Sequence, residues 1–195
     1  MKLMRQQHGV SLIELVIGLA IIGVMLVVGI PEMSSFMANT RVNTAANAFL
    51  AGIQQARAEA VKLNANVSFL QLDVDASASN SQVTSGSTTG QNWMIRVQNP
   101  VNQLFTMIDG RNATDGSLQQ VTVTGSTALV VFTPVSMLST TFNPAAVTFA
   151  FANPNAGACA PTGKIRCLNV VVSRGGLAKL CDPAVSAVGD SRSCV

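Results

Sequence analysis

An apolar segment near the N-terminus constrains the fold of this chain more than any other feature. Residues 10–30, VSLIELVIGLAIIGVMLVVGI, are apolar or small except for Ser11 and Glu14. A helix rises about 1.5 Å per residue, so a segment of this length matches the roughly 30 Å hydrocarbon core of a bilayer. The sequence therefore predicts a transmembrane helix over residues 10–30, in which the Glu14 carboxylate requires a compensating partner.

The flanking residues indicate how this helix is oriented in a membrane. Lys2 and Arg5 precede it, and the far side, VVGIPEMSSF, lacks the small-residue cleavage site of a secretory signal. By the positive-inside rule, the N-terminus stays in the cytoplasm and the rest of the chain is exported. We therefore expect a single-pass membrane protein with an exported C-terminal domain.

Helical periodicity continues beyond the apolar segment. Pro31 is expected to kink or locally unwind the helix, because proline lacks a backbone donor and clashes with the preceding turn. Apolar residues then recur at spacings of three and four: Val42, Ala46, Phe49, Ile53, Ala56 and Ala60. This stripe predicts an amphipathic helix over residues 31–64 that packs on a soluble domain, with Asn64 as its stop.

Residues 65–195 have the sequence pattern of short β-strands. Runs rich in β-branched residues occupy residues 66–72, 93–98, 120–124, 128–132, 147–152 and 168–173, with Gly, Asn, Ser and Pro between them. The Ser- and Thr-rich segment 73–92 is interpreted as a mobile surface loop. The sequence thus predicts an α+β fold, in which one long N-terminal helix packs on antiparallel β-sheet.

The residues that usually carry catalysis are scarce. The single histidine, His8, precedes the apolar segment, and the chain has no tyrosine and only 11% charged residues, against about 25% in typical soluble domains. No paired carboxylates or nucleophile motif is visible. We expect a protein that is not an enzyme and binds no metal or cofactor. A membrane-anchored enzyme or sensor is the distant alternative.

Four cysteines lie near the C-terminus: Cys159, Cys167, Cys181 and Cys194. An even number beyond an exporting helix favours disulfides over free thiols. The absence of a CxxC pair disfavours a zinc site. Three pairings are open, and Cys159–Cys167 with Cys181–Cys194 is preferred because these bridges close the shortest loops.

The N-terminus resembles a known processing signal. Basic residues, Gly9 and the hexapeptide VSLIEL at residues 10–15 resemble the class III signal of type IV pilins and type II secretion pseudopilins, although Val10 stands where phenylalanine is usual. The resemblance implies that residues 1–9 form a leader, which prepilin peptidase removes between Gly9 and Val10 before Val10 is N-methylated. It also implies that Glu14 pairs with the terminal amine of a neighbouring subunit during assembly.

The helix after Pro31 is similar to that of the FimT/GspH family. The matching residues are Arg41, Val42, Ala45, Ala46, Ala56, Arg57, Glu59, Ala60 and Asn64. The resemblance implies a pilin fold with two small sheets, and a bacterial inner-membrane protein whose β-rich domain is periplasmic before it enters a filament. Its implied partners are other pilins or pseudopilins, the peptidase and the inner-membrane assembly platform. The expected function is that of a minor pilin of a type IV pilus, with protein H of a type II secretion system as the alternative.

The C-terminal segment is the most basic part of the exported domain. Its cations are Lys164, Arg166, Arg174, Lys179 and Arg192. Some FimT proteins bind DNA through a Gly-Arg-x-Arg motif followed by cysteine. Aligned on Cys181, this chain has Gly176, Leu177 and Lys179, so the first arginine is missing and the second is lysine. Arg174 and Lys179 are therefore candidate contacts for double-stranded DNA, and a solvated basic hairpin is the alternative.

Overall fold

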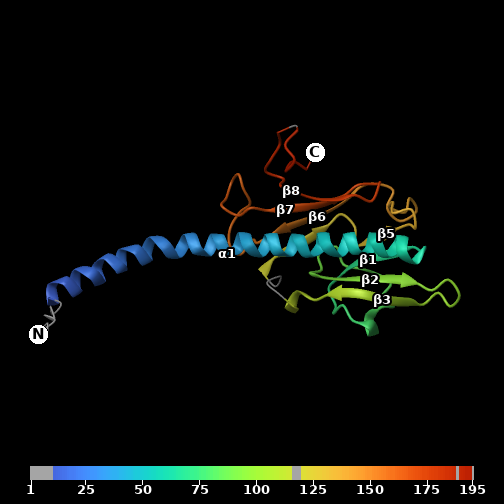
Figure 1. Ribbon diagram of the computed structural model, residues 1–195, viewed down its shortest axis with the longest axis horizontal. Coiled ribbons are helices and arrows are strands. Elements are labelled where there is room, and N and C mark those ends of the chain that lie inside the picture. The colour runs from blue at the N-terminus through green and yellow to red at the C-terminus, as the bar shows by residue number, and fades with distance from the viewer. Residues whose placement is uncertain (1–10, 116–119, 188, 195) are drawn as a thin grey trace, which may run out of the picture.

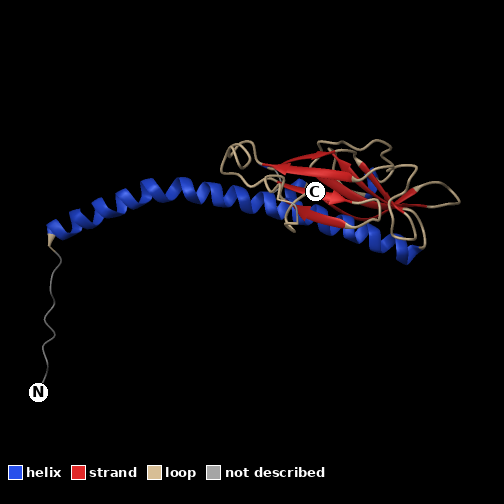
Figure 2. Ribbon diagram, turned by 90° about the horizontal axis from the view of Figure 1, so that it is seen from above, coloured by secondary structure: helices blue, strands red, loops and turns tan. Residues whose placement is uncertain are grey.

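One long helix organises the structure, a computed structural model that describes residues 11–115, 120–187 and 189–194, without the side chains of residues 27–32. Helix α1 spans Leu12–Leu63 and continues through Pro31, so it does not unwind there. Figure 2 shows a gradual curvature of its N-terminal half. A kink at Pro31 itself stays a prediction, because that side chain lies outside the described part. No helix within the described residues combines the length and apolarity that crossing a membrane requires.

The C-terminal end of α1 packs on the rest of the chain, as its apolar stripe predicts. Every stripe residue from Val42 to Ala60 is fully buried. The helix ends where Asn64 adopts φ 48°, and the Asn64 N–H donates to the carbonyls of Ala60 and Val61. Asparagine tolerates this left-handed conformation better than most residues, which explains why the helix stops here.

Two antiparallel sheets cover this half of the helix (Figure 1). The first has the order β3-β2-β1-β5 and the second the order β4-β6-β7-β8. The bounds are β1 Val67–Leu72, β2 Asn92–Gln98, β3 Phe105–Arg111, β4 Thr122–Gly125, β5 Leu129–Phe132, β6 Val147–Ala152, β7 Leu168–Val172 and β8 Ala178–Cys181. Short 3-10 helices span Ala78–Asn80 and Ala113–Asp115. The expected α+β fold, a long helix packed on antiparallel sheet, is confirmed.

Phe49 of α1 joins the two sheets in a single core. Its ring centroid lies 5.6 Å from that of Phe69 on β1, and 5.7 Å and 5.1 Å from those of Phe149 and Phe151 on β6. Phe69 in turn stacks on Trp93 of β2 at 5.4 Å. The side chain of Phe49 is fully buried. Because it packs against both sheets, it sets how closely each sheet approaches the helix at this position.

The segment 73–92 packs against the first sheet, so its interpretation as a surface loop was wrong for part of its length. Ser81 and Gly90 are buried. Arg96, on the face of β2 opposite the helix, donates from Nη1 to the carbonyls of Ser81 and Val83, at 2.5 and 2.6 Å. The Gln71 side chain also donates to the Gly90 carbonyl at 2.7 Å. Backbone carbonyls therefore anchor a segment whose composition suggested a solvated loop.

Candidate functional site

The two residues of the expected cleavage site, Gly9 and Val10, lie outside the described residues. Ser11 precedes the helix in extended conformation, and its carbonyl accepts the first helical bond, from the Leu15 N–H at 3.2 Å. Glu14 is exposed in the first turn of α1. A carboxylate at this position interacts favourably with the positive end of the helix dipole, and it is accessible to a cation from outside the chain.

The N-terminal half of α1 extends alone beyond the β-sheets (Figure 1). Its large apolar side chains are each more than half exposed: Leu12, Ile13, Leu15, Val16, Ile17, Leu19, Ile21, Ile22, Val24, Met25 and Leu26. They surround the helix rather than forming a stripe, a pattern typical of a helix that is covered on all sides. An apolar surface of this extent marks a region that binds other apolar groups.

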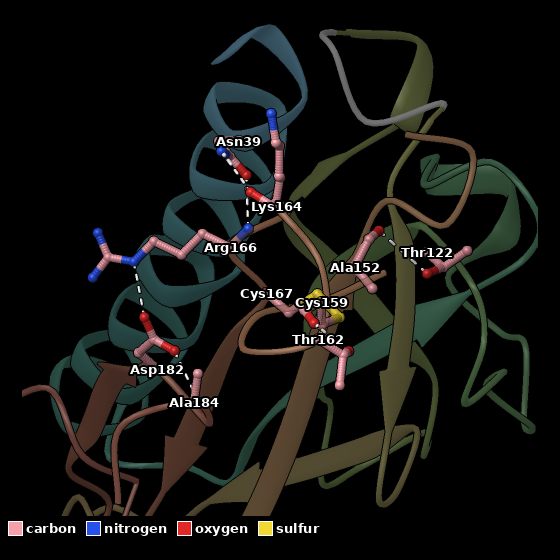
Figure 3. Close-up of a disulfide and its surroundings, with 10 residues drawn as sticks. All are labelled: Asn39, Thr122, Ala152, Cys159, Thr162, Lys164, Arg166, Cys167, Asp182 and Ala184. Carbon is pink, nitrogen blue, oxygen red and sulfur yellow. Dashed lines mark hydrogen bonds and ion pairs between the residues drawn. A yellow bond between two sulfur atoms is a disulfide. The ribbon is translucent and has the colours of Figure 1, made fainter. Parts of the chain in front are cut away.

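The helix also holds a disulfide-closed loop close to the point where it meets the domain. Cys159 is bonded to Cys167, the pairing that the short loop favours. The Asn39 side chain of α1 binds this loop twice, because its Nδ2 donates to the Lys164 carbonyl at 3.4 Å and its Oδ1 accepts from the Arg166 N–H at 2.7 Å (Figure 3). Asn39 thus acts as a side-chain bridge between α1 and a loop far away in sequence.

The C-terminal residues form a second closed loop. Cys181 is bonded to Cys194, which completes the expected pairing. The Asp182 N–H donates to the Arg192 carbonyl at 2.7 Å, and the Arg192 guanidinium pairs with Asp190 at 2.8 Å. This hydrogen-bonded arginine lowers the pKa of Asp190 to about 2. The tail is therefore fixed against the end of β8 by covalent, hydrogen-bonded and ionic contacts.

Arg174 and Lys179, the candidate DNA contacts, lie on the same hairpin. Arg174 is exposed in the turn between β7 and β8, and its guanidinium makes no hydrogen bond or ion pair with the part of the chain that the structure describes. Lys179 lies on β8, where its Nζ donates to the Ser193 carbonyl at 3.2 Å. The nearby Arg166 pairs with Asp182 at 2.9 Å. Two of the cations of this segment, Arg166 and Arg192, are thus paired with carboxylates, and Lys179 is bound to a backbone carbonyl.

A further helix contact was not foreseen from the sequence. Arg57 donates from Nε to the Ser136 carbonyl at 3.1 Å and from Nη2 to the Ser136 hydroxyl at 3.3 Å. Gly176, at φ 78°, packs so closely here that a Cβ would lie 2.0 Å from the Ser136 carbonyl oxygen. Arg57 belongs to the family pattern, but its partner is 79 residues away, so no local sequence signal identifies this contact.

The sequence matches two family models. Residues 45–176 match the type II transport protein GspH, and residues 4–30 match the prokaryotic N-terminal methylation motif. No curated protein shows significant similarity to the chain.

The chain is similar to two solved structures, the first of which shares its fold. A crystal structure of the type IV minor pilin FimU from Pseudomonas aeruginosa has 17% identity and a TM-score of 0.50, and the match covers 74% of this chain and 91% of that one. The solution structure of Escherichia coli GspH has 16% identity and a TM-score of 0.46, and the match covers 74% and 90% of the two chains. The GspH model extends over more than half of the chain, which therefore belongs to the family of the type II transport protein GspH.

Proposed function

We propose that this chain is a minor pilin that enters a type IV pilus and helps to prime its assembly. The observation that supports this function best is the division of α1. One half is buried in the domain, and the other presents an uncovered apolar surface with Glu14 in its first turn. Such a helix is suited to packing in a bundle of similar helices, where neighbours cover the apolar side chains.

The proposed pathway begins at the membrane. Residues 10–30 anchor the chain in the inner membrane, with the leader in the cytoplasm and the β-rich domain in the periplasm. This anchor is supported by the sequence alone, because residue 10 and the side chains of residues 27–32 lie outside the described part. Prepilin peptidase cleaves after Gly9, and the new amine on Val10 is methylated. The assembly platform then transfers the helix from lipid into the filament.

Glu14 supplies the directional contact in this transfer. Its carboxylate pairs with the N-terminal amine of an adjacent subunit, so that an isolated charge in an apolar bundle is replaced by an ion pair. Removing the carboxylate leaves the partner amine uncompensated, which costs about 3–5 kcal/mol for a buried pair. Glu14→Ala should therefore be cleaved normally but be depleted from filaments.

The test compares Glu14→Ala with Glu59→Ala in cells that express the peptidase and the pilus proteins. Glu59 is a matched control, because it lies on the same helix and, within the described residues, its ion pair is with Lys62, one turn further along, at 3.0 Å. The readouts are the size shift on leader removal and the amount of chain in sheared filaments. Equal filament incorporation of wild type and Glu14→Ala would refute the assembly role of this residue.

Membership of the GspH family supports a second candidate, a minor pseudopilin of a type II secretion system. The two functions differ in the phenotype of a gene deletion. Loss of pili with intact protein secretion supports the pilus, whereas loss of secretion with intact pili supports the secretion system and refutes our first proposal.

DNA capture is a secondary role that we propose for the pilus function. The supporting observation is the exposure of Arg174 and Lys179 on one hairpin. A gel shift of the full chain with double-stranded DNA should weaken in the double variant Arg174→Ala/Lys179→Ala, and binding should fall steeply with salt, as for any phosphate contact. Lys62→Ala, which removes a cation from the end of α1, serves as the control. Unchanged binding in the double variant would remove both residues from the site.

A further inference from the structure

We propose that the free edge of β8 binds an extended acidic segment of another protein as an additional strand of the second sheet. This surface is separate from the apolar half of α1, and its binding can be measured without filament assembly.

The β7–β8 hairpin directs two pairs of backbone groups outward. The Ser173 N–H donates to the Leu177 carbonyl at 2.9 Å, so these residues form a hydrogen-bonded pair at the start of the ladder. Bonded and non-bonded pairs alternate in antiparallel strands, and Val172 is opposite Ala178 while Val170 is opposite Leu180. The N–H and C=O groups of Ala178 and Leu180 therefore point away from β7, toward the edge of the sheet.

The next outward group on this edge already has a strand-like partner. The Asp182 N–H donates to the Arg192 carbonyl at 2.7 Å, and Asp182 forms a parallel bridge with Ser193. The C-terminal tail thus covers the edge at Asp182. Within the described chain, Ala178 and Leu180 make no backbone or side-chain hydrogen bond outside the β7–β8 ladder. The tail therefore leaves these two residues available to an added strand.

Each of the other sheet edges has at least one outward backbone group bound by an amide side chain or by loop backbone. On β5, the Asn143 side chain accepts from the Val131 N–H and donates to the Leu129 carbonyl, both at 2.8 Å. On β3, the Gln82 side chain donates to the Phe105 carbonyl at 2.6 Å and accepts from the Phe105 N–H at 3.0 Å. On β4, the Gly125 N–H donates to the Thr88 carbonyl at 2.7 Å. Since natural proteins usually protect edge strands, the two consecutive outward positions of β8 at Ala178 and Leu180 form a surface suited to strand addition.

Two cavities adjoin this edge, and α1 forms a wall of each. The first, of about 290 Å³, is lined by Leu180 together with Phe36 and Asn43 of the helix. The second, of about 500 Å³, is lined by Ala178 and Leu177 on the strand side and by helix residues that include Arg57. Phe36 and Leu177 are both about two-thirds exposed, at 67% and 64%. Alternate side chains of an added strand would project toward these cavities.

The charges beside β8 indicate which charge a segment bound to this edge should carry. Arg57 lines the second cavity, Arg174 lies in the turn at that end of the strand, and Arg166 lines the first cavity. Asp182 is the carboxylate that pairs with Arg166. A basic margin attracts an acidic segment, and a second copy of this chain, whose net charge is +1 once Lys2 and Arg5 of the leader are removed, offers no strongly acidic partner. The occupant we assign is therefore an acidic, extended segment of a different protein.

Amide hydrogen exchange on the full chain in detergent micelles tests this assignment. The probe is a short synthetic peptide of alternating valine and glutamate, and the comparison peptide has lysine in place of glutamate. We expect the acidic probe to slow exchange of the Ala178 and Leu180 amides at least about tenfold, while the Lys179 amide, already bonded to β7, changes little. Unchanged exchange at Ala178 and Leu180, or equal protection by the basic peptide, would overturn the proposal.

A backbone variant provides an independent test. Leu180→Pro removes an outward N–H that the β7–β8 ladder does not use, and proline is tolerated at such positions of edge strands. We expect the variant to bind the acidic probe at least about tenfold more weakly, whereas Val101→Ala, at a 90% exposed position in the turn between β2 and β3, retains wild-type binding. Wild-type affinity in folded Leu180→Pro contradicts strand addition. If that variant fails to fold, the exchange measurement on the wild-type chain decides the question.

Discussion

Replacing Phe49 with alanine should separate the two sheets from the helix more effectively than any other single truncation in the core. The side chain is fully buried and has three aromatic neighbours, one on the first sheet and two on the second, with centroid distances between 5.1 and 5.7 Å. Truncation of a buried phenylalanine costs about 3–5 kcal/mol, through lost burial and the cavity that remains.

The aromatic contacts place Phe49→Ala in the upper part of this range. Each favourable ring pair adds about 0.5–1.5 kcal/mol beyond area burial, although neighbouring pairs are not additive. We therefore expect a loss of about 4–5 kcal/mol, a large share of the roughly 5–15 kcal/mol by which domains are stable. Gaps between an α-helix and two sheets close poorly, because both sheets are held by their own ladders.

The assay is urea unfolding of the full chain, followed by the fluorescence of Trp93. This residue is the single tryptophan, and it stacks on Phe69, a direct neighbour of Phe49. Phe36→Ala on the same helix is the control, because Phe36 is 67% exposed and its truncation should cost less than about 1 kcal/mol. A loss below about 2 kcal/mol for Phe49→Ala, or one equal to the control, would refute the role assigned to this ring.

Three further changes test local features. Asn39→Ala should lower the free energy of unfolding by about 1–3 kcal/mol, measured in urea, because it removes two hydrogen bonds to the disulfide loop. Gly90→Ala should cost about 1–3 kcal/mol or more in the same assay, since its Cβ would lie 1.9 Å from the Leu72 carbonyl oxygen, and a wild-type midpoint would contradict this packing. Asp190 pairs with Arg192, so its pKa of about 2 in the folded chain is below the value in the unfolded chain. The ion pair therefore stabilises the fold above the unfolded pKa, and this contribution is lost as the pH falls toward 2. Carbon NMR titration of the Asp190 carboxyl in wild type and in Arg192→Gln can check this, because the variant should titrate at a higher pH.

The long helix could be predicted from the sequence because its signal is strong and local. The stripe from Val42 to Ala60 has the period of a helix over many turns, and all of its members are buried. Six of the strands coincide with the β-branched runs. Two strands escaped prediction for a physical reason: β3 contains Asp109 and Gly110, and β8 has only four residues with a lysine among them. Neither strand contains the run of β-branched residues from which the other six are predicted.

Contacts between distant residues could not be predicted in this way. Arg96 is 3% exposed, stacks at 3.9 Å on the Phe105 ring, and donates to two carbonyls of the segment 73–92. Burial lowers the pKa of its guanidinium. In the sequence, an arginine in a strand indicates that its side chain is exposed. Its actual partners are backbone carbonyls, which every residue has, so the residue types do not reveal the contact. The same applies to Asn39 and Arg57, whose partners are all backbone atoms or a serine.

The composition of α1 explains how one helix can belong to a stable domain and still be available for assembly. Alanines such as Ala45, Ala46, Ala56 and Ala60 let the sheets approach the buried half closely, whereas large aliphatic residues surround the exposed half. Since the exposed half makes few contacts with the domain, substitutions there should act on assembly and leave domain unfolding unchanged. Glu14→Ala should therefore have the urea midpoint of wild type, while Phe49→Ala loses stability, a separation of effects that a helix packed along its whole length could not produce.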